Sequence, residues 1–457
     1  MMISDLQTFM APGRRCHLIG IGGVSMSPLA EVLQNMGLVV TGSDIAESAA
    51  VLHLRELGIP VAVGHAPENI RGAEFIIRTA AAHDDNPEVA AARNTGIPVF
   101  ERAQAWGYIM RSYPNALCIA GTHGKTTTTS MATHILMAAQ ADPTVMIGGT
   151  LPLLHAGHRV GKGNTIVLES CEYYDSFLSF SPTVAVILNV DADHLDYFHD
   201  LEDVKASFRS FAELVPADGH VIANRDDRNS MDALAGIDRS VTTFGFSPEA
   251  DVQAADLKIS GGKSEFDVLC RGSFYTHVRL QVPGRHNVLN ALAASAAAHV
   301  LGLPGSAVTE GLAGFTGAGR RFEYKGVCSG ADVYDDYAHH PGELKSLLDT
   351  ATELGYDRII LAFQPHTYSR TKALFDDFAA QLARADLPLL ADIYAARETN
   401  TIGISSRDLA DAVPGARYCA SFDEMERVLR SLAKPGDLIL TVGAGDIYKV
   451  GEAIVER

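Results

Sequence analysis

The 457-residue sequence lacks several features that mark particular classes of protein. No apolar run approaches the roughly 18 residues needed to cross a bilayer. The first 15 residues contain no apolar segment behind a basic flank, so no signal peptide is predicted. Basic residues are outnumbered, 37 against 55 acidic ones, which gives a formal net charge of −18 and a surface unsuited to nucleic-acid phosphates. We therefore expect a cytoplasmic protein that binds neither membrane nor nucleic acid.

Cysteine is scarce and scattered. The six cysteines include no pair at CxxC spacing, so neither a cysteine metal cluster nor a disulfide framework is predicted. The remaining composition, 47% hydrophobic and 20% charged, is that of an ordinary globular chain. Its length predicts two to four domains.

A short apolar run, a glycine turn and a helical pattern are expected to follow one another in three segments. The segments begin near Cys16, Leu117 and Val333. Strand, turn, helix and strand in this order build parallel sheets. Small residues at 316–319 indicate a domain boundary. The pattern predicts three α/β domains.

The second segment contains a phosphate-binding pattern, the sequence GTHGKTT at 121–127, between a predicted strand and a predicted helix. Its glycines let backbone N–H groups turn toward an anion, and the helix N-terminus adds a positive dipole. Lys125 is expected to contact the β- and γ-phosphates of ATP, and the Thr126 hydroxyl to ligate Mg²⁺. Only two residues separate Gly121 from Gly124, where the strict Walker pattern has four, so an ordinary loop with a surface lysine is the alternative.

Acidic residues and a histidine follow at the ends of two further predicted strands. Glu169 ends one strand, with Glu172 and Asp175 close behind it, and the other leads into the acidic run 191–196, which contains His194. The carboxyl ends of parallel strands converge on the crevice where ligands bind. A histidine is an unusual ligand for Mg²⁺ and indicates a second metal site. The alternative for 191–196 is a solvated acidic turn.

The N-terminal glycines Gly20, Gly22 and Gly23 are a weak dinucleotide signal, because the third glycine of GxGxxG is absent. One alternative is a packed strand turn. Another is an NAD-dependent oxidoreductase with Asp44 on the ribose. The second alternative leaves the phosphate loop unexplained.

Several segments together resemble the Mur ligase family. They are GTHGKTTTT at 121–129, the strand-end Glu169, NVDADHLDYF at 189–198 and GRHNVLNALAA at 284–294. Five more resemble the branch that adds L-alanine to UDP-N-acetylmuramate: HLIGIGGVSMS at 17–27, GSD at 42–44, RRFE at 320–323, DDYAHHP at 335–341 and FQPHTYSRT at 363–371. The resemblance extends to GAGDI at 443–447, which is nearly the whole chain.

This resemblance implies three domains, each with its own ligand. Residues 1–104 would form a Rossmann-like domain that binds the UDP substrate, 105–316 a P-loop ATPase-type parallel sheet that binds ATP, and 317–457 a Rossmann-like domain that closes over the amino acid. The muramoyl carboxylate would attack the γ-phosphate of ATP, and the alanine amine would then displace phosphate from the acyl phosphate. Two Mg²⁺ ions, with Mn²⁺ as a substitute, would assist, and the protein would be a monomer or homodimer.

The resemblance also implies residue roles. Catalytic roles fall on Lys125, His194, Arg321, His339, His340 and Arg370. ATP-binding roles fall on Gly121, Thr122, His123, Gly124, Lys125, Thr126, Thr127, His286, Asn287, Asn290, Arg321 and Asp335, the last on the ribose. Substrate-binding roles fall on Gly22, Gly23, Ser43, Asp44, Thr79, Glu172 and Asp175. The metal ligands would be Thr126, Glu169 and His194.

Some positions depart from the family pattern. Thr367 stands where a second arginine is usual, and ESCEYYDSF at 169–177 replaces the commoner EADESD form. The nearest alternative function is a murein tripeptide recycling ligase acting on the same nucleotide, although FQPHTYSRT favours the alanine enzyme. A non-catalytic nucleotide-binding protein is a further alternative. It is disfavoured by four retained residues, Lys125, Glu169, His194 and Arg321.

Overall fold

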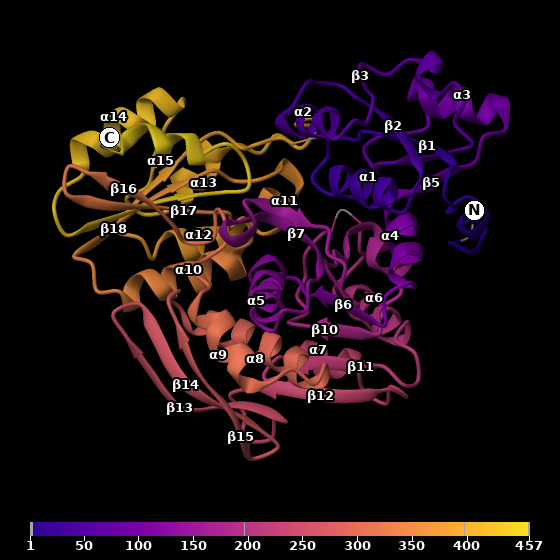
Figure 1. Ribbon diagram of the computed structural model, residues 1–457. Helices are drawn as coiled ribbons and strands as arrows, with labels where there is room; N and C mark the ends of the chain where they lie inside the picture. Colours follow the sequence, from indigo (N-terminus) through magenta and orange to yellow (C-terminus); the bar gives the residue numbers. More distant parts are fainter. Residues whose placement is uncertain (1–2, 196, 397, 456–457) are drawn as a thin grey trace.

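Three separate sheets organise the chain, and the computed structural model describes residues 3–195, 197–396 and 398–455. In Figure 1 the sheets define an N-terminal unit in indigo, a central unit in magenta to salmon and a C-terminal unit in orange to yellow. In this view the N-terminal and C-terminal units both lie above the central unit. The predicted α/β fold with three sheets is confirmed.

The N-terminal sheet is parallel throughout, in the order β3-β2-β1-β4-β5. Its strands are β1 Arg15–Ile19, β2 Val39–Asp44, β3 Val61–Val63, β4 Phe75–Arg78 and β5 Val99–Glu101. Its helices are α1 Met26–Asn35, α2 Ala49–Glu56, α3 Pro87–Thr95 and α4 Arg102–Met110, with 3₁₀ turns η1 Ile3–Thr8 and η2 Pro67–Ile70. The chain reverses its direction of winding between β1 and β4, and such a switch point is where parallel sheets bind ligands.

The central sheet has ten strands in the order β15-β14-β13-β12-β11-β10-β6-β9-β7-β8. The strands are β6 Asn115–Ala120, β7 Thr144–Leu151, β8 Ala156–Arg159, β9 Thr165–Glu169, β10 Val184–Ile187, β11 His220–Asn224, β12 Ser240–Gly245, β13 Val252–Ser260, β14 Lys263–Cys270 and β15 Ser273–Leu280. The pairs from β13 to β7 are parallel, whereas β14 pairs antiparallel with both β13 and β15, and β8 is antiparallel to β7. The sequence did not predict these antiparallel strands.

Helices cover both faces of the central sheet. They are α5 Lys125–Ala138, α6 Leu201–Glu213, α7 Arg228–Ala233, α8 Arg285–Val300 and α9 Gly305–Ala313, with 3₁₀ turns η3 Pro152–Leu154 and η4 Tyr173–Ser179. Helices α5, α8 and α9 pack on one face, where every alanine of α8 is buried. Because alanine side chains are small, α8 lies close to both α5 and the sheet. The opposite face shares one continuous core with the N-terminal unit, partly through α4.

Helix α4 joins the first two units, so the predicted boundary at residue 104 falls inside a helix. Trp106 on α4 is buried, and its indole N–H donates to the Ser25 carbonyl at 3.2 Å. The precise division of the chain into domains stays a prediction.

The C-terminal sheet has the order β16-β17-β21-β18-β19-β20, and only β16 is antiparallel to its neighbour. Its strands are β16 Glu323–Cys328, β17 Ala331–Asp336, β18 Arg358–Phe363, β19 Leu387–Leu390, β20 Arg417–Tyr418 and β21 Asp437–Val442. Its helices are α10 Pro341–Glu353, α11 Tyr368–Ala373, α12 Phe375–Leu382, α13 Ser406–Ala412, α14 Phe422–Leu432 and α15 Tyr448–Ile454. Two cores, one on each face, make it a doubly wound sheet. Across the described ranges, no helix is long and apolar enough to span a membrane.

Candidate functional site

The predicted phosphate loop joins the end of β6 to the start of α5. Gly124 has φ 84°, and a β-carbon there would lie 2.7 Å from Asn290 Oδ1, so both backbone and space require glycine. The Asn189 side chain holds the loop in place through two hydrogen bonds to the His123 backbone. Its Oδ1 accepts from the His123 N–H at 2.7 Å, and its Nδ2 donates to the His123 carbonyl at 3.0 Å. Asn189 had no predicted role, although it lies between β10 and the acidic run.

Lys125 provides a fixed positive charge at this loop. Its Nζ donates to the Gly121 carbonyl at 2.5 Å and to Glu172 Oε2 at 3.0 Å. Burial alone would lower the pKa of Lys125, but the neighbouring Glu172 carboxylate outweighs it and raises the pKa. The ammonium therefore stays protonated at neutral pH, as a phosphate-binding lysine requires.

Two sets of potential metal ligands lie beside the loop. The Thr126 hydroxyl donates to Glu169 Oε1 at 3.0 Å, and this hydroxyl–carboxylate pair matches the oxygen ligands that Mg²⁺ prefers. His194 Nε2 lies 4.0 Å from Glu172 Oε1, and the Tyr173 ring stacks on the imidazole with centroids 4.3 Å apart. His194 has a left-handed φ of 55°, a strained conformation typical of functional positions. Asp196, the end of the acidic run, lies outside the described residues.

The C-terminal unit contacts the acidic run directly. Arg370 Nη2 donates to Asp193 Oδ1 at 3.0 Å, and His340 Nε2 lies 3.2 Å from the Ala192 carbonyl oxygen. Burial would raise the pKa of Asp193, but the Arg370 guanidinium dominates and keeps it well below its usual range. The structure thus brings two predicted residues of the C-terminal unit, His340 and Arg370, against the acidic run of the central unit, beside the phosphate loop.

Glu343 organises the histidines of the DDYAHHP segment. Its Oε2 accepts from the His339 N–H at 2.9 Å, and its Oε1 lies 3.5 Å from His123 Nδ1 and 3.8 Å from Arg321 Nη1. Burial opposes the charge on Glu343, yet His339, His123 and Arg321 together hold its pKa well below the usual value. Glu343 was not predicted, although its place three residues after the N-cap His340 and two after Pro341 marks a helix start.

The ribose contact predicted for Asp335 does not fit its placement. Its carboxylate is fully buried, accepts from Arg320 Nε at 2.8 Å and accepts from the Thr441 hydroxyl at 2.9 Å. The adjacent Asp336 accepts from two backbone N–H groups, and burial raises its pKa to about 6. Asp335 therefore anchors Arg320 inside the C-terminal unit.

Three residues predicted to lie near ATP follow one another at the start of α8. Asn290 Oδ1 accepts from the Thr128 hydroxyl at 3.2 Å, which places Asn290 against the phosphate loop. Asn287 Oδ1 accepts from Asn290 Nδ2 at 3.1 Å. His286, one residue before Asn287, has an exposed side chain.

In the N-terminal unit the predicted nucleotide residues divide into two groups. The Gly22 N–H donates to Asp44 Oδ2 at 2.8 Å, and Thr79 lies against Gly20, so these residues gather at the β1/β4 switch point. Gly23 closes the same turn by donating to the Gly20 carbonyl at 3.1 Å. Ser43 does not join them.

The Ser43 side chain points into the unit instead. It is fully buried and donates to Glu88 Oε2 at 2.5 Å, so the predicted substrate contact does not fit its placement. Asp175 is also engaged within the protein, because its carboxylate accepts from the Tyr197 and Ser207 hydroxyls.

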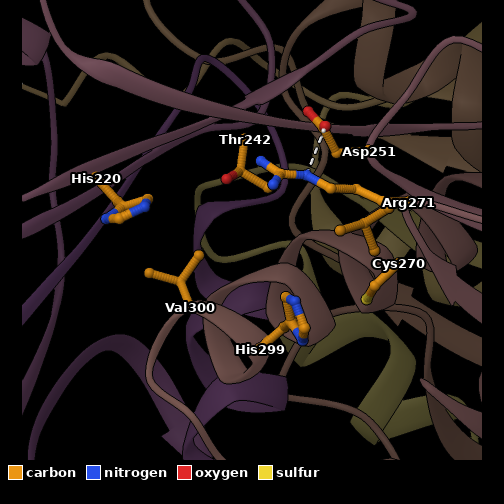
Figure 2. A pocket seen from close by; sticks show the side chains of 8 residues that line it. His220, Thr242, Asp251, Cys270, Arg271, His299 and Val300 are labelled. Atoms are coloured by element: carbon orange, nitrogen blue, oxygen red, sulfur yellow. Dashed lines mark hydrogen bonds and ion pairs between the residues drawn. The ribbon is translucent and has the colours of Figure 1, made fainter. Parts of the chain in front are cut away.

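A separate cavity of about 180 Å³ opens on the central unit, between the strands β11 to β14 and the end of α8 (Figure 2). Its lining includes His220, His299, Cys270 and the Asp251–Arg271 pair, whose Oδ1 and Nε are 3.3 Å apart. None of the predicted site residues lines this cavity. The phosphate loop is therefore the better candidate for the reaction centre.

Comparison with known proteins covers the chain almost from end to end. Residues 15–114 match the family described as Mur ligase, catalytic domain, residues 119–298 the Mur ligase middle domain, and residues 320–445 the Mur ligase glutamate ligase domain. A UDP-N-acetylmuramate–L-alanine ligase of Caldanaerobacter subterraneus subsp. tengcongensis is 46% identical over 99% of both chains.

Solved structures agree with this match. The UDP-N-acetylmuramate–alanine ligase of Thermotoga maritima has a TM-score of 0.79 at 31% identity, covering 96% of this chain and 98% of that one. A murein peptide ligase of Psychrobacter arcticus has a TM-score of 0.70 at 23% identity, covering 97% and 100%, and so shares the fold.

Proposed function

The chain belongs to the Mur ligase family, and we propose that it catalyses the ATP-dependent ligation of L-alanine to UDP-N-acetylmuramate in peptidoglycan synthesis. The observation that supports this best is the contact between two units, in which His340 and Arg370 of the C-terminal unit reach the loop that follows β10. A ligase needs this arrangement, because the acid, the nucleotide and the amine must meet in one water-poor space. The choice of alanine rests on the relatives named above.

Activation of the acid would begin at the phosphate loop. The muramoyl carboxylate and the γ-phosphate repel each other, so cationic groups must screen them as they approach. Lys125, protonated and fixed by the loop carbonyls, supplies one such charge. Arg321, held by Glu343 at 3.8 Å, supplies a second from the C-terminal unit. The carboxylate oxygen bonds to the γ-phosphorus, ADP departs, and an acyl phosphate remains.

Amide formation would take place at the domain interface. Arg370 is suited to bind the alanine carboxylate through its planar guanidinium, exchanging Asp193 for the substrate. Burial lowers the pKa of His339 and of His340, so both imidazoles are neutral at physiological pH and able to accept a proton from the ammonium of alanine. The freed amine attacks the acyl carbon, and phosphate leaves.

The ligand chemistry fits Mg²⁺ at Thr126 and Glu169, with Glu172 and His194 as a second set that Mn²⁺ also suits. When bound, such ions neutralise phosphate charge. Glu172 would have to release Lys125 in part to serve as a ligand, since the two groups are 3.0 Å apart. ATP and nucleotide precursors are cytoplasmic, so we expect the protein to act there, as a monomer or homodimer.

The test is phosphate release from Mg-ATP with UDP-N-acetylmuramate and either free L-alanine or the murein tripeptide. We expect release that depends on L-alanine and is lost in Lys125→Ala. Lys162→Ala, at an exposed lysine away from the loop, is the control and should keep full activity. Release only with tripeptide would assign the chain to the recycling ligases, and release with neither would refute both activities.

A further inference from the structure

Three potential metal ligands from two units meet beside the phosphate loop, apart from the two sets described above. They are His123 of the loop itself, Asp191 after β10, and His340 at the N-cap of α10. One donor atom of each lies within 4.8 Å of the donors of the other two. His123 Nε2 is 3.8 Å from Asp191 Oδ2, and the two imidazole centroids are 4.9 Å apart.

The His123 ring is oriented as in many metal-binding histidines. Its Nε2 atom is buried and, within the described part of the chain, has no hydrogen-bond partner. Its other ring nitrogen, Nδ1, faces Glu343 Oε1 at 3.5 Å. A carboxylate behind a ligating imidazole fixes the ring and increases its basicity toward a metal ion. The buried free nitrogen therefore points to a missing ligand on the Asp191 side.

The three donors border a common space next to Gly342. A β-carbon on Gly342 would lie 3.3 Å from His123 Nε2, 3.4 Å from His340 Nδ1 and 3.7 Å from Asp191 Oδ2. Because Gly342 has only hydrogen there, the donors can contract around a small ion. His340 Nδ1 now accepts from the Gly342 N–H at 3.2 Å, a bond that the ion would replace.

We propose that His123, Asp191 and His340 form a binding site for a zinc-class transition-metal ion that bridges the central and C-terminal units. Two imidazoles and one carboxylate are ligands typical of Zn²⁺, whereas Mg²⁺ prefers oxygen alone. Three protein ligands leave the fourth position open to water or a phosphate oxygen. Since His123 lies in the phosphate loop, the bound ion inhibits the ligase; this consequence, unlike the binding itself, rests on the proposed function.

The experiment titrates the full chain with Co²⁺ and with Zn²⁺ in excess Mg²⁺ and without nucleotide. Tetrahedral Co²⁺ absorption and competition with a chromophoric chelator report binding directly. We expect one ion per chain at this site and at least about tenfold weaker binding in Asp191→Asn, which removes a donor. Gly342→Ala keeps every donor and fills the space between them, so it should weaken binding as well.

Two control variants locate the ion. His194→Ala changes the other histidine set and should leave this ion in place. His277→Ala removes an imidazole on β15 that lies 2.6 Å from Asp267 and 3.1 Å from Glu265, outside the site, and should also have no effect. Circular dichroism confirms that each variant is folded.

Absence of binding would overturn the proposal, and so would equal affinity in wild type, Asp191→Asn and Gly342→Ala. Loss of the ion in His194→Ala alone would overturn it too, by assigning the ion to Glu172 and His194. Inhibition of phosphate release by Zn²⁺ in wild type, relieved in Asp191→Asn, would support the inhibitory role. A wild-type protein that binds the ion but releases no phosphate would refute the ligase function and leave the site standing.

Discussion

Arg370 of α11 and Asp193 of the loop after β10, 177 residues apart in sequence, form an ion pair with side chains only 11% and 9% exposed. The pair joins the central and C-terminal units. Removing Arg370 leaves a buried carboxylate without its partner, so Arg370→Ala should destabilise the protein by about 3 kcal/mol. Urea unfolding of wild type, both single variants and the Arg370→Ala/Asp193→Ala double variant measures this effect.

The double variant should recover part of the loss, because no unpaired charge remains. The Arg384–Asp349 pair in the same unit is the control, since its side chains are 34% and 43% exposed. Arg384→Ala should cost less than about 1 kcal/mol. Equal effects at the two pairs would contradict the role assigned to burial at Arg370.

Gly124 is expected to tolerate no side chain. Gly124→Ala combines a left-handed φ of 84° with a β-carbon 2.7 Å from Asn290 Oδ1. Gly58→Ala is its matched control, because Gly58 has φ 81° and no atom within 4 Å of the added carbon. In the control, the free energy of unfolding should fall only by the conformational cost of a left-handed alanine, about 1–2 kcal/mol.

Gly124→Ala should lose more than Gly58→Ala, and it should also weaken ATP binding as Asn290 is pushed aside. Chemical unfolding and calorimetric titration with Mg-ATP measure the two effects. If Gly124→Ala bound ATP as tightly as Gly58→Ala, the loop geometry described here would not be the one that holds phosphate.

The Thr126 hydroxyl is expected to be needed for the metal nucleotide. Thr126→Val keeps the shape and removes the oxygen next to Glu169, so ATP affinity should fall about tenfold or more in Mg²⁺. Thr126→Ser should restore it. Thr133→Val is the control, because that hydroxyl on the same helix donates to the Thr129 carbonyl at 2.7 Å, away from the loop. Nucleotide titrations at several Mg²⁺ concentrations distinguish the variants.

Glu88 should make the N-terminal unit sensitive to acid. Burial opposes its charge, but the His17 imidazole, the Ser43 hydroxyl and the Asn69 amide outweigh burial and lower the pKa of Glu88 to about 2 from 4.5. A carboxylate with a lowered pKa in the folded state stabilises the protein above its unfolded pKa. That contribution, about 3 kcal/mol, should disappear as the pH falls from 4.5 to 2.

The free energy of unfolding at each pH can be measured by following the fluorescence of Trp106, the one tryptophan of the sequence. The stability difference between wild type and Glu88→Gln should shrink across that range. Glu310→Gln is the control, since Glu310 is an exposed carboxylate on α9, and this variant should leave the pH dependence of the free energy of unfolding unchanged. A wild-type advantage that stays constant down to pH 2 would contradict the assignment.

Local patterns in the sequence determined the α/β class, the three units and the phosphate loop. Buried parallel strands appear as continuous apolar runs, and the turn at Gly121 to Gly124 has backbone angles that only glycine adopts readily. These signals depend on neighbours along the chain. The order of the motifs also placed three residues. Lys125 and Thr126 stand at the start of a helix and Glu169 at the end of a strand.

The tertiary structure alone decided which way several side chains point and what they meet. Ser43 lies on β2 and Asp335 on β17, yet both side chains face inward, because side chains alternate across a strand and register with its neighbours selects the buried face. Glu343 acquires its role only when α10 packs beside His123. Contacts between residues so distant in sequence depend on how the helices and strands pack, and no local sequence pattern reports that packing.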